Sequence, residues 1–395
     1  MPMTLMSNYA RLPVTFVKGE GAWLWDTQGT RYLDAIAGIA VCGLGHAHPA
    51  VTTAICQQAQ QLLHTSNWYG IAHQQTLADT LIRITSLERA FFGNSGAEAN
   101  EAAIKIARLY GHSRGIDLPT IIVTEGSFHG RTLATLTATG NPKMQAGFAP
   151  LVPGFIRVPY NDIDAIAQLA EQHPEIVAIL VEPVTGEGGI VIPDPDYLVN
   201  LRTLCDRHQW LLMLDEIQTG MGRTGRWFAY QETGILPDVL SLAKGLGNGV
   251  PIGACLARGQ AAALFQPGHH GSTFGGNPLV CRVALAVIQA IEQENLLPHV
   301  QTLSQRFYNG FSKALASISG VREIRVKGLM IGIELDRPGY PLMSKALEHR
   351  LLINVTAERV VRLLPPLIIN DVQADEIITT VSQLLREFFN SPVIH

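Results

Sequence analysis

The sequence predicts an α/β fold in which a large domain, built on a mostly parallel central sheet covered by helices, is joined to a smaller α/β domain formed from both termini. Two observations predict this fold. The middle of the chain alternates short apolar runs with longer segments of helical periodicity, which is the pattern of βαβ units. Most of these apolar runs are almost continuously hydrophobic, as in strands that helices bury on both faces.

Length and composition agree with such a fold. At about 150 residues per domain, 395 residues correspond to two or three domains. Hydrophobic residues make up 47% of the chain and charged residues 16%, which supplies a large core and excludes disorder as the main state. The formal net charge of −4 is small and has the wrong sign for a nucleic-acid binder, so we expect small-molecule partners.

Three features predict the compartment and the absence of membrane contact. The five cysteines are scattered and odd in number, which is typical of reduced thiols in a cytosolic protein. The N-terminus carries polar residues and prolines where a secretory signal has an apolar stretch. The longest uncharged apolar stretch, residues 35–45, is far shorter than the roughly 20 residues that span a bilayer. We therefore expect a cytoplasmic protein.

The large domain is expected over residues 51–274. Apolar runs predict its strands at residues 90–92, 120–124, 176–181, 210–214, 239–242 and 252–257. Good helix formers, or the apolar spacing of helices packed on a sheet, predict helices at residues 97–110, 163–172 and 197–208.

The smaller domain is expected over residues 275–395, with residues 1–50 packing against it. Residues 14–34 carry the turn sequences GEG and TQGT between runs of strand formers, which predicts hairpins. The C-terminal part is predicted to contain helices at residues 277–294 and 297–318, and strands within residues 328–335, 351–356 and 360–366.

Three segments are candidates for chemistry. The run FFGNSGAEANEAAIKIAR passes from a strand into a helix, whose N-terminus suits a phosphate, although Asn94 or Ser95 can equally be a simple N-cap. Asp215 ends a buried strand, where ligands bind in parallel sheets, although an acid at a strand end is often only solvated. Lys244 lies in the apolar run SLAKGLGNG, where burial lowers the amine pKa as imine formation requires; the alternative is a surface lysine.

Two further patterns are rejected as sites. GMGRTG matches a dinucleotide fingerprint, but its glycines do not directly follow a strand and no long helix follows them, so a turn is predicted and a nicotinamide-dependent oxidoreductase is disfavoured. His46 and His48, with Cys42 nearby, have no second cluster at zinc spacing, so no metal is expected.

Seven motifs occur in order along nearly the whole chain: NSGAEANEAAIKIAR, SFHGRT, VEPVTGEGG, DEIQTGMGRTG, SLAKGLGNGVPIGA, GSTFGGNPL and VRLLPPLI. Together they resemble the class III, pyridoxal-phosphate-dependent aminotransferases of fold type I. The resemblance implies catalytic roles for two residues. Lys244 would form the Schiff base with pyridoxal 5′-phosphate and move the proton during transfer, and Asp215 would keep the pyridine nitrogen protonated.

The resemblance also implies contacts that hold the cofactor. Gln218 would hydrogen-bond the ring oxygen and Phe128 would stack on the ring. Ser95, Gly96 and Ala97 would hold the phosphate. Thr273 would reach the phosphate of the other subunit, so a homodimer with shared active sites is implied.

The implied substrate contacts follow from charge, because arginine binds carboxylates in a bidentate manner. Arg131 would hold the distal carboxylate of the amine donor and Arg362 the carboxylate next to the reacting carbon of glutamate. Glu187 would pair with Arg362 when the first substrate lacks that carboxylate. Tyr9 and Ser272 match further substrate contacts; for each of the five, a structural ion pair or hydrogen bond is the alternative.

Within the class, the resemblance favours N2-acetylornithine as amine donor and 2-oxoglutarate as acceptor, in arginine biosynthesis. Ile39 stands where relatives acting on free ornithine tend to carry tyrosine, so a free α-ammonium would be poorly solvated there. The alternatives are that Ile39 is simply core, and that succinylornithine, succinyldiaminopimelate or 4-aminobutyrate is the donor; an aminomutase of the same fold also remains open.

Overall fold

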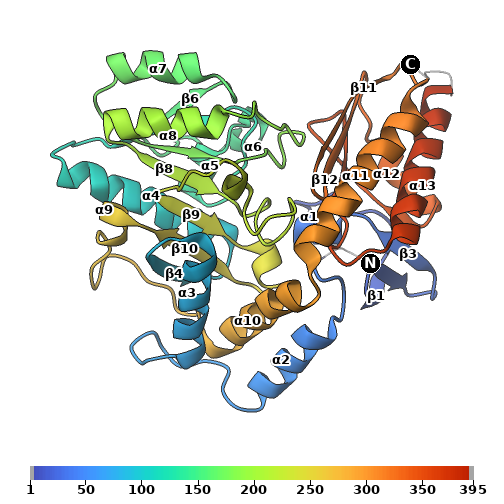
Figure 1. Ribbon diagram of the computed structural model, residues 1–395, viewed down its shortest axis with the longest axis horizontal. Coiled ribbons are helices and arrows are strands. Elements are labelled where there is room, and N and C mark those ends of the chain that lie inside the picture. Colours follow the sequence, from blue (N-terminus) through green and yellow to red (C-terminus); the bar gives the residue numbers. More distant parts are fainter. Residues whose placement is uncertain (1–3, 391–395) are drawn as a thin grey trace.

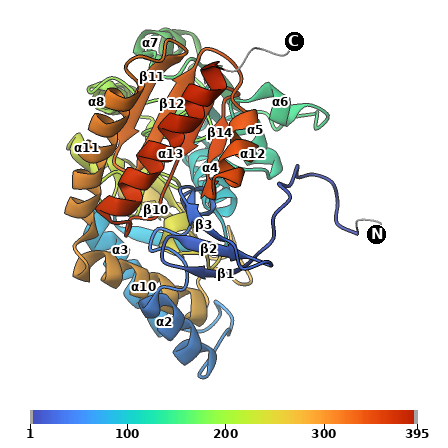
Figure 2. The same cartoon turned by 90° about the vertical axis from the view of Figure 1, so that its right-hand side faces the viewer.

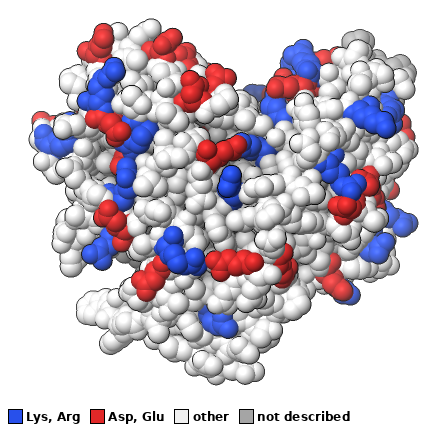
Figure 3. Space-filling model, viewed as in Figure 1, with Lys and Arg blue, Asp and Glu red and all other residues white. Residues whose placement is uncertain are grey.

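The computed structural model describes residues 4–390. A larger part contains the central sheet, and a smaller part carries two further sheets and the C-terminal helices (Figure 1). No helix within residues 4–390 is long and apolar enough to cross a membrane. On the face drawn in Figure 3, Lys and Arg side chains are interspersed with Asp and Glu, without an extended patch of one sign.

The central sheet has seven strands in the order β4-β10-β9-β8-β7-β5-β6. Strand β10 pairs antiparallel with both β4 and β9, and the other four strand pairs of this sheet are parallel, so the sheet is mostly parallel, as predicted. The bounds are β4 Arg89–Gly93, β5 Thr120–Thr124, β6 Phe155–Val158, β7 Ile176–Val181, β8 Leu211–Asp215, β9 Val239–Leu242 and β10 Gly253–Ala257.

All six predicted strands are found, with ends shifted by at most one residue. The seventh, β6, was not predicted. It has four residues at the edge of the sheet, and only Val158 among them is buried, so it carries neither the length nor the apolar run of the inner strands.

Helices bury both faces of this sheet, which explains why its strands are continuously apolar. Successive strand residues belong to different packing clusters: Leu212 packs in the cluster that contains α8 (Tyr197–His208), whereas Met213 packs in the one that contains α4 (Gly96–Ser113). The three predicted helices of the large domain are confirmed as α4, α7 (Ile163–Gln172) and α8.

The N-terminal residues form β1 (Phe16–Glu20), β2 (Trp23–Asp26) and β3 (Arg31–Asp34), and β3 pairs in parallel with β13 (Leu351–Leu352). Strands β1 to β3 thus join the C-terminal part through β13. Figure 2 shows β1, β2 and β3 beside the C-terminal elements.

The second small sheet has the order β11-β12-β15-β14. Its strands are β11 Val321–Lys327, β12 Met330–Leu335, β14 Asn354–Thr356 and β15 Val360–Leu363. Strand β11 was not predicted, because its sequence VREIRVK alternates polar and apolar residues and only one of its seven residues is buried. The strand structure expected within residues 351–356 is found as two short strands, β13 (Leu351–Leu352) and β14, which belong to different sheets and are separated by residue 353.

The predicted helices at residues 277–294 and 297–318 are found as α10 (Pro278–Gln293) and α11 (Leu296–Leu315). Helix α10 packs on α2 (Pro49–Ala59) and α3 (Ala72–Thr85), and eleven of its residues are buried. The remaining helices are α1 Ala37–Ala40, α5 Leu133–Ala138, α6 Pro142–Gln145, α9 Gly259–Ala262, α12 Pro341–Glu348 and α13 Asp371–Asn390. The division into residues 1–50, 51–274 and 275–395 stays a prediction.

Candidate active site

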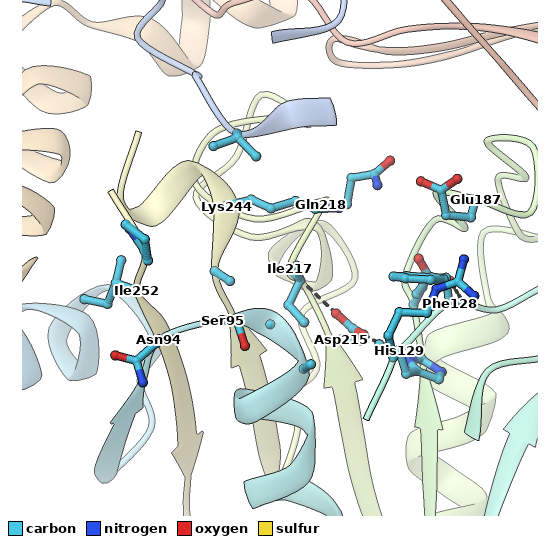
Figure 4. A pocket seen from close by; sticks show the side chains of 18 of the residues that line it. Asn94, Ser95, Phe128, His129, Glu187, Asp215, Ile217, Gln218, Lys244 and Ile252 are labelled. Atoms are coloured by element: carbon cyan, nitrogen blue, oxygen red, sulfur yellow. Dashed lines mark hydrogen bonds and ion pairs between the residues drawn. The ribbon is translucent and has the colours of Figure 1, made fainter. Parts of the chain in front are cut away.

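A cavity of about 370 Å³ opens where strands of the central sheet end. Asp215 is the last residue of β8, Glu182 follows β7, and Lys244 lies two residues after β9. Parallel strands bring their carboxyl ends to one edge, so these three groups come together although 62 residues separate the first from the last in sequence. Figure 4 shows side chains that line the cavity.

One wall of the cavity is the N-terminus of α4. The Ser95 hydroxyl accepts a hydrogen bond from the backbone N–H of Glu98 at 3.2 Å, so Ser95 is the N-cap. The cap and the anion site are compatible, because the N–H groups of Gly96 and Ala97 have no acceptor inside the helix. Gly96 leaves room for Ile217, since a Cβ there would lie 2.7 Å from the end of the Ile217 side chain, which would then have to shift.

Lys244 lines the cavity from a short 3₁₀ turn, with a positive φ of 45° that is uncommon for a residue other than glycine. Burial is the main cause that lowers its amine pKa; the Arg362 charge lowers it further, and Glu187 acts in the opposite direction. Within residues 4–390 its amine forms no hydrogen bond or ion pair. A lysine amine with a lowered pKa is suited to nucleophilic attack on a carbonyl.

Asp215 is held from both carboxylate oxygens. Its Oδ2 accepts hydrogen bonds from Asn100 Nδ2 at 2.7 Å and His129 Nδ1 at 2.8 Å, and its Oδ1 accepts from the backbone N–H of Ile217 at 3.0 Å. Asp215 is 3% exposed. A buried, fixed carboxylate is a strong partner for a positive charge placed in the cavity.

Glu182, Asn100 and His129 were missed by the sequence analysis. The Glu182 carboxylate accepts the backbone N–H of Phe128 at 3.1 Å and that of Gly186 at 3.0 Å, joining two loops of the cavity. Burial, followed by the nearby Asp215 charge, raises its pKa to about 7. Its position directly after a buried strand was the signal that could have found it.

A second charged group lies at the side of the cavity. Arg362 donates from Nη1 to Glu187 Oε1 at 2.7 Å and from Nη2 to Asn354 Oδ1 at 2.7 Å. Arg362 is 1% exposed, and Glu187 lines the cavity. Burial raises the Glu187 pKa, but the charge and hydrogen bond of Arg362, with Lys244, outweigh it and the pKa is lowered.

Arg131 lines the same cavity and has no acidic partner within residues 4–390. Its guanidinium carbon lies 5.6 Å from the centre of the Phe128 ring. The cavity therefore offers one arginine that is free for a carboxylate and a second that is already paired.

The whole chain matches known proteins. The family model described as aminotransferase class-III matches residues 5–385. The chain belongs to the class III aminotransferases. An acetylornithine aminotransferase of Nitrosomonas europaea is 58% identical over 98% of this chain and 99% of that protein.

Two solved structures share the fold of this class III aminotransferase. An ornithine aminotransferase of Toxoplasma gondii, with partial occupancy of PLP at its active site, has a TM-score of 0.94 and 34% identity, covering 98% of this chain and 94% of that one. An acetylornithine aminotransferase of Elizabethkingia anophelis has a TM-score of 0.87 and 32% identity, covering 97% and 96%.

Pyridoxal 5′-phosphate is the cofactor of this class, and the residues present fit it. The helix N-terminus at Ser95 suits the phosphate, and the buried Asp215 carboxylate suits a protonated ring nitrogen. Gln218 Oε1 is buried without a hydrogen-bond partner inside residues 4–390, as expected for an atom that awaits a ligand. Figure 4 shows Lys244 and Gln218 among the side chains that line the cavity.

Nine of the site residues expected from the sequence line this one cavity: Ser95, Gly96, Ala97, Phe128, Arg131, Glu187, Asp215, Gln218 and Lys244. Arg362 reaches it through Glu187. Tyr9, Ser272 and Thr273 do not line it. Tyr9 is 69% exposed on the N-terminal segment, and Thr273 lines a separate depression with Ser272, whose Oγ accepts from Asn94 at 3.2 Å.

The GMGRTG motif and the pair His46 and His48, which were rejected as ligand sites, have structural roles instead. Residues 217–228 of the GMGRTG region form turns and bends, followed by a four-residue 3₁₀ helix, so the predicted turn is confirmed. His46 pairs with Asp34 at 2.8 Å and His48 with Glu294 at 3.0 Å, so the two histidines point to different partners.

Proposed function

We propose that this aminotransferase moves the terminal amino group of N2-acetylornithine to 2-oxoglutarate, giving N-acetylglutamate 5-semialdehyde and glutamate, in arginine biosynthesis. The strongest support is that only one of two arginines at the site is paired with an acid. Arg131 is free to bind a carboxylate, whereas Arg362 is paired with Glu187. A donor with one carboxylate far from its reacting amine requires only Arg131, and an acceptor with two requires both.

We assign the chemical roles as follows. The cofactor, when bound, supplies an electron-accepting ring. Lys244 would hold the cofactor covalently, and its Nζ would move the proton to and from the reacting carbon. The Asp215 carboxylate would keep the ring nitrogen protonated; Asn100 and His129 hold that carboxylate by hydrogen bonds at 2.7 and 2.8 Å.

An apolar wall supports the choice of an acylated donor. Val41 lines the cavity, and Ile39, two residues before it in the chain, packs against a small apolar cluster that contains Ala40. A free α-ammonium next to this wall would lose hydration without gaining a partner, whereas an acylated α-nitrogen carries no charge. This favours acetylornithine over ornithine.

A substrate panel tests the proposal. The holoenzyme is given acetylornithine, succinylornithine, succinyldiaminopimelate, ornithine and 4-aminobutyrate at equal concentration with 2-oxoglutarate, and kcat/KM is compared. We expect acetylornithine to be the best donor, with the succinylated amines following because the longer acyl group changes only the outer pocket. A higher value for ornithine or 4-aminobutyrate would overturn the substrate assignment and leave the aminotransferase class intact.

We also infer a homodimer in which each subunit completes the site of the other. Thr273 does not reach the cavity of its own chain, and large apolar side chains beside it are exposed: Trp68 by 93%, Tyr69 by 71% and Phe274 by 61%. Exposed aromatic groups in one region are typical of an interface.

Mixed dimers test this inference. Lys244→Ala and Thr273→Asp homodimers should each be inactive or nearly so. A mixed dimer should regain one complete site, formed by Lys244 of one chain and Thr273 of the other, and with it activity. Absence of recovery in verified mixed dimers, or a monomer by sedimentation, contradicts shared sites.

A cytoplasmic location is proposed from the cysteines. All five are free, and Cys205, Cys255 and Cys281 are buried among apolar groups. Such thiols are typical of a reducing compartment. Fractionation of the source cells, with the enzyme assayed in each fraction, tests this.

A further inference from the structure

Arg223 joins the two parts of the molecule. It belongs to the turn GMGRTG, none of whose residues lines the candidate active-site cavity, and it is 2% exposed. Its Nη1 donates to the carbonyl oxygens of Leu329, at 3.3 Å, and of Pro365. Its own carbonyl accepts the N–H of Leu329 at 2.9 Å. One residue of the large part thus makes three hydrogen bonds to the C-terminal part.

The two carbonyls lie at one end of the strand pair that carries Arg362. In this pair, β12 residue Ile331 is opposite Leu363, and Gly332 is opposite Arg362. Continuing the antiparallel register by two residues brings Leu329 opposite Pro365. Arg223 therefore bridges the end of the β12–β15 ladder, three residues from Arg362.

Glycines allow this close approach. A Cβ on Gly328 would lie 2.4 Å from the Arg223 carbonyl oxygen, and its φ of +60° favours glycine. A Cβ on Gly222 would lie 3.1 Å from Leu367 and 3.2 Å from Leu297, both in the C-terminal part. Gly222 and Gly328 therefore permit close contact between the two parts.

A buried guanidinium is costly unless its interactions are specific. Burial lowers the pKa of Arg223 to about 9, and the charge of the buried Asp34 acts in the opposite direction. Methionine or leucine would fill the same space without that cost, but neither can donate to two carbonyls. The hydrogen bonds to Leu329 and Pro365 are therefore what distinguishes arginine here.

We propose that Arg223 is a positioning residue for the acceptor: by holding the end of the β12–β15 pair, it places Arg362 relative to Lys244 and so sets the affinity for the carboxylate next to the reacting carbon. This rests on the proposed function in one respect, the role of Arg362. The amine donor, which Arg131 holds, depends much less on Arg223.

The test compares Arg223→Lys and Arg223→Gln with Arg226→Lys and Arg226→Gln in the holoenzyme. Arg226 is three residues away in the same turn and is exposed, so it is a matched control. We expect the Arg223 variants to raise the KM for 2-oxoglutarate about tenfold, while the KM for the amine donor and kcat change less than about threefold. The Arg226 variants should match the parent enzyme.

A second variant disturbs the contact between Arg223 and Leu329 by a change next to Leu329. Gly328→Ala would displace Leu329 from Arg223 and should show the same selective loss for 2-oxoglutarate. Equal changes in both KM values, or no change, would overturn the proposal. So would failure of both Arg223→Lys and Gly328→Ala to fold, because the contact would then serve stability alone.

The outcome is separable from that of the proposed function. Binding of 2-oxoglutarate to the amine form of the enzyme is read from the cofactor absorbance, without any amine donor. If the parent enzyme does not use acetylornithine, the proposed substrate is wrong, yet weaker 2-oxoglutarate binding by the Arg223 variants still supports the positioning role. If the parent binds 2-oxoglutarate and the variants bind it equally well, the positioning role is wrong.

Discussion

Arg362 Nη1 lies 2.7 Å from Glu187 Oε1, and this ion pair stands between the substrate cavity and the small sheet that carries Arg362. The Glu187 pKa is lowered, so the carboxylate stays charged well below neutral pH and protonation does not release the arginine. Under the proposed function, a substrate carboxylate would therefore have to displace Glu187, and the pair would act as a gate that responds to the substrate.

Replacing Glu187 by Gln should change the half-reaction with glutamate more than the half-reaction with the amine donor. A neutral amide no longer competes for Arg362, so glutamate and 2-oxoglutarate should bind more tightly, by roughly threefold to tenfold, and compete better with the amine donor. Separate single-turnover measurements with glutamate and with acetylornithine give the comparison.

Glu171→Gln is the control, because Glu171 is exposed on α7 and does not line the cavity. Equal effects of Glu187→Gln on both half-reactions would count against a gate.

Lys244→Ala should abolish transamination while the fold persists, because the task of the amine is covalent and positional. Borohydride reduction of the parent holoenzyme, followed by peptide mass mapping, should place the cofactor mass on the peptide that contains Lys244. Lys313→Ala, at an exposed lysine on α11, should behave as the parent does. Cofactor mass on a peptide without Lys244 would show the assignment to be wrong.

Asp215→Asn should lower the single-turnover rate by roughly three powers of ten, since a neutral partner no longer favours a protonated ring nitrogen and each ~1.4 kcal/mol of lost transition-state stabilisation costs tenfold. The cofactor should still bind through the helix N-terminus at Ser95. The measurement is stopped-flow absorbance at saturating cofactor, with the exposed Asp117→Asn as control. A near-normal rate removes Asp215 from this role.

His46 should make stability depend on pH. The hydrogen bond with Asp34 is the main cause that raises its pKa from 6.5 to about 9; one with Cys42 adds to it, and burial opposes. Because the raised pKa belongs to the folded state, the protonated His46 stabilises the fold fully below pH 6.5. This contribution to the free energy of unfolding, ~1–3 kcal/mol, is lost as the pH rises through 9.

Urea unfolding midpoints at pH 6.5 and 9.5 measure this. His46→Gln should lose less stability than the parent between the two values, and His349→Gln, at an exposed histidine, should follow the parent. An equal loss in His46→Gln and the parent would exclude His46 as the titrating group.

The sequence predicts best where one physical requirement dominates a segment. Strands β5, β7 and β9 are found at the expected residues, because burial on both faces demands an unbroken apolar run. Strand β11 was missed because only one of its seven residues is buried and its sequence mixes polar with apolar residues. Asn100 was missed because an inward-facing amide on a helix looks like any other polar residue until its partner is known.

What the sequence by itself determined is the α/β class, the apolar strands, the position of Asp215 at a strand end and of Lys244 in an apolar turn. These follow from local patterns of burial and from chain order. Only the tertiary structure decided that Glu187 holds Arg362 and that Arg223 reaches Leu329 and Pro365. Such pairs are separated by more than 100 residues, and they exist because the folded sheets bring distant strand ends together and exclude the water that would otherwise solvate each charge.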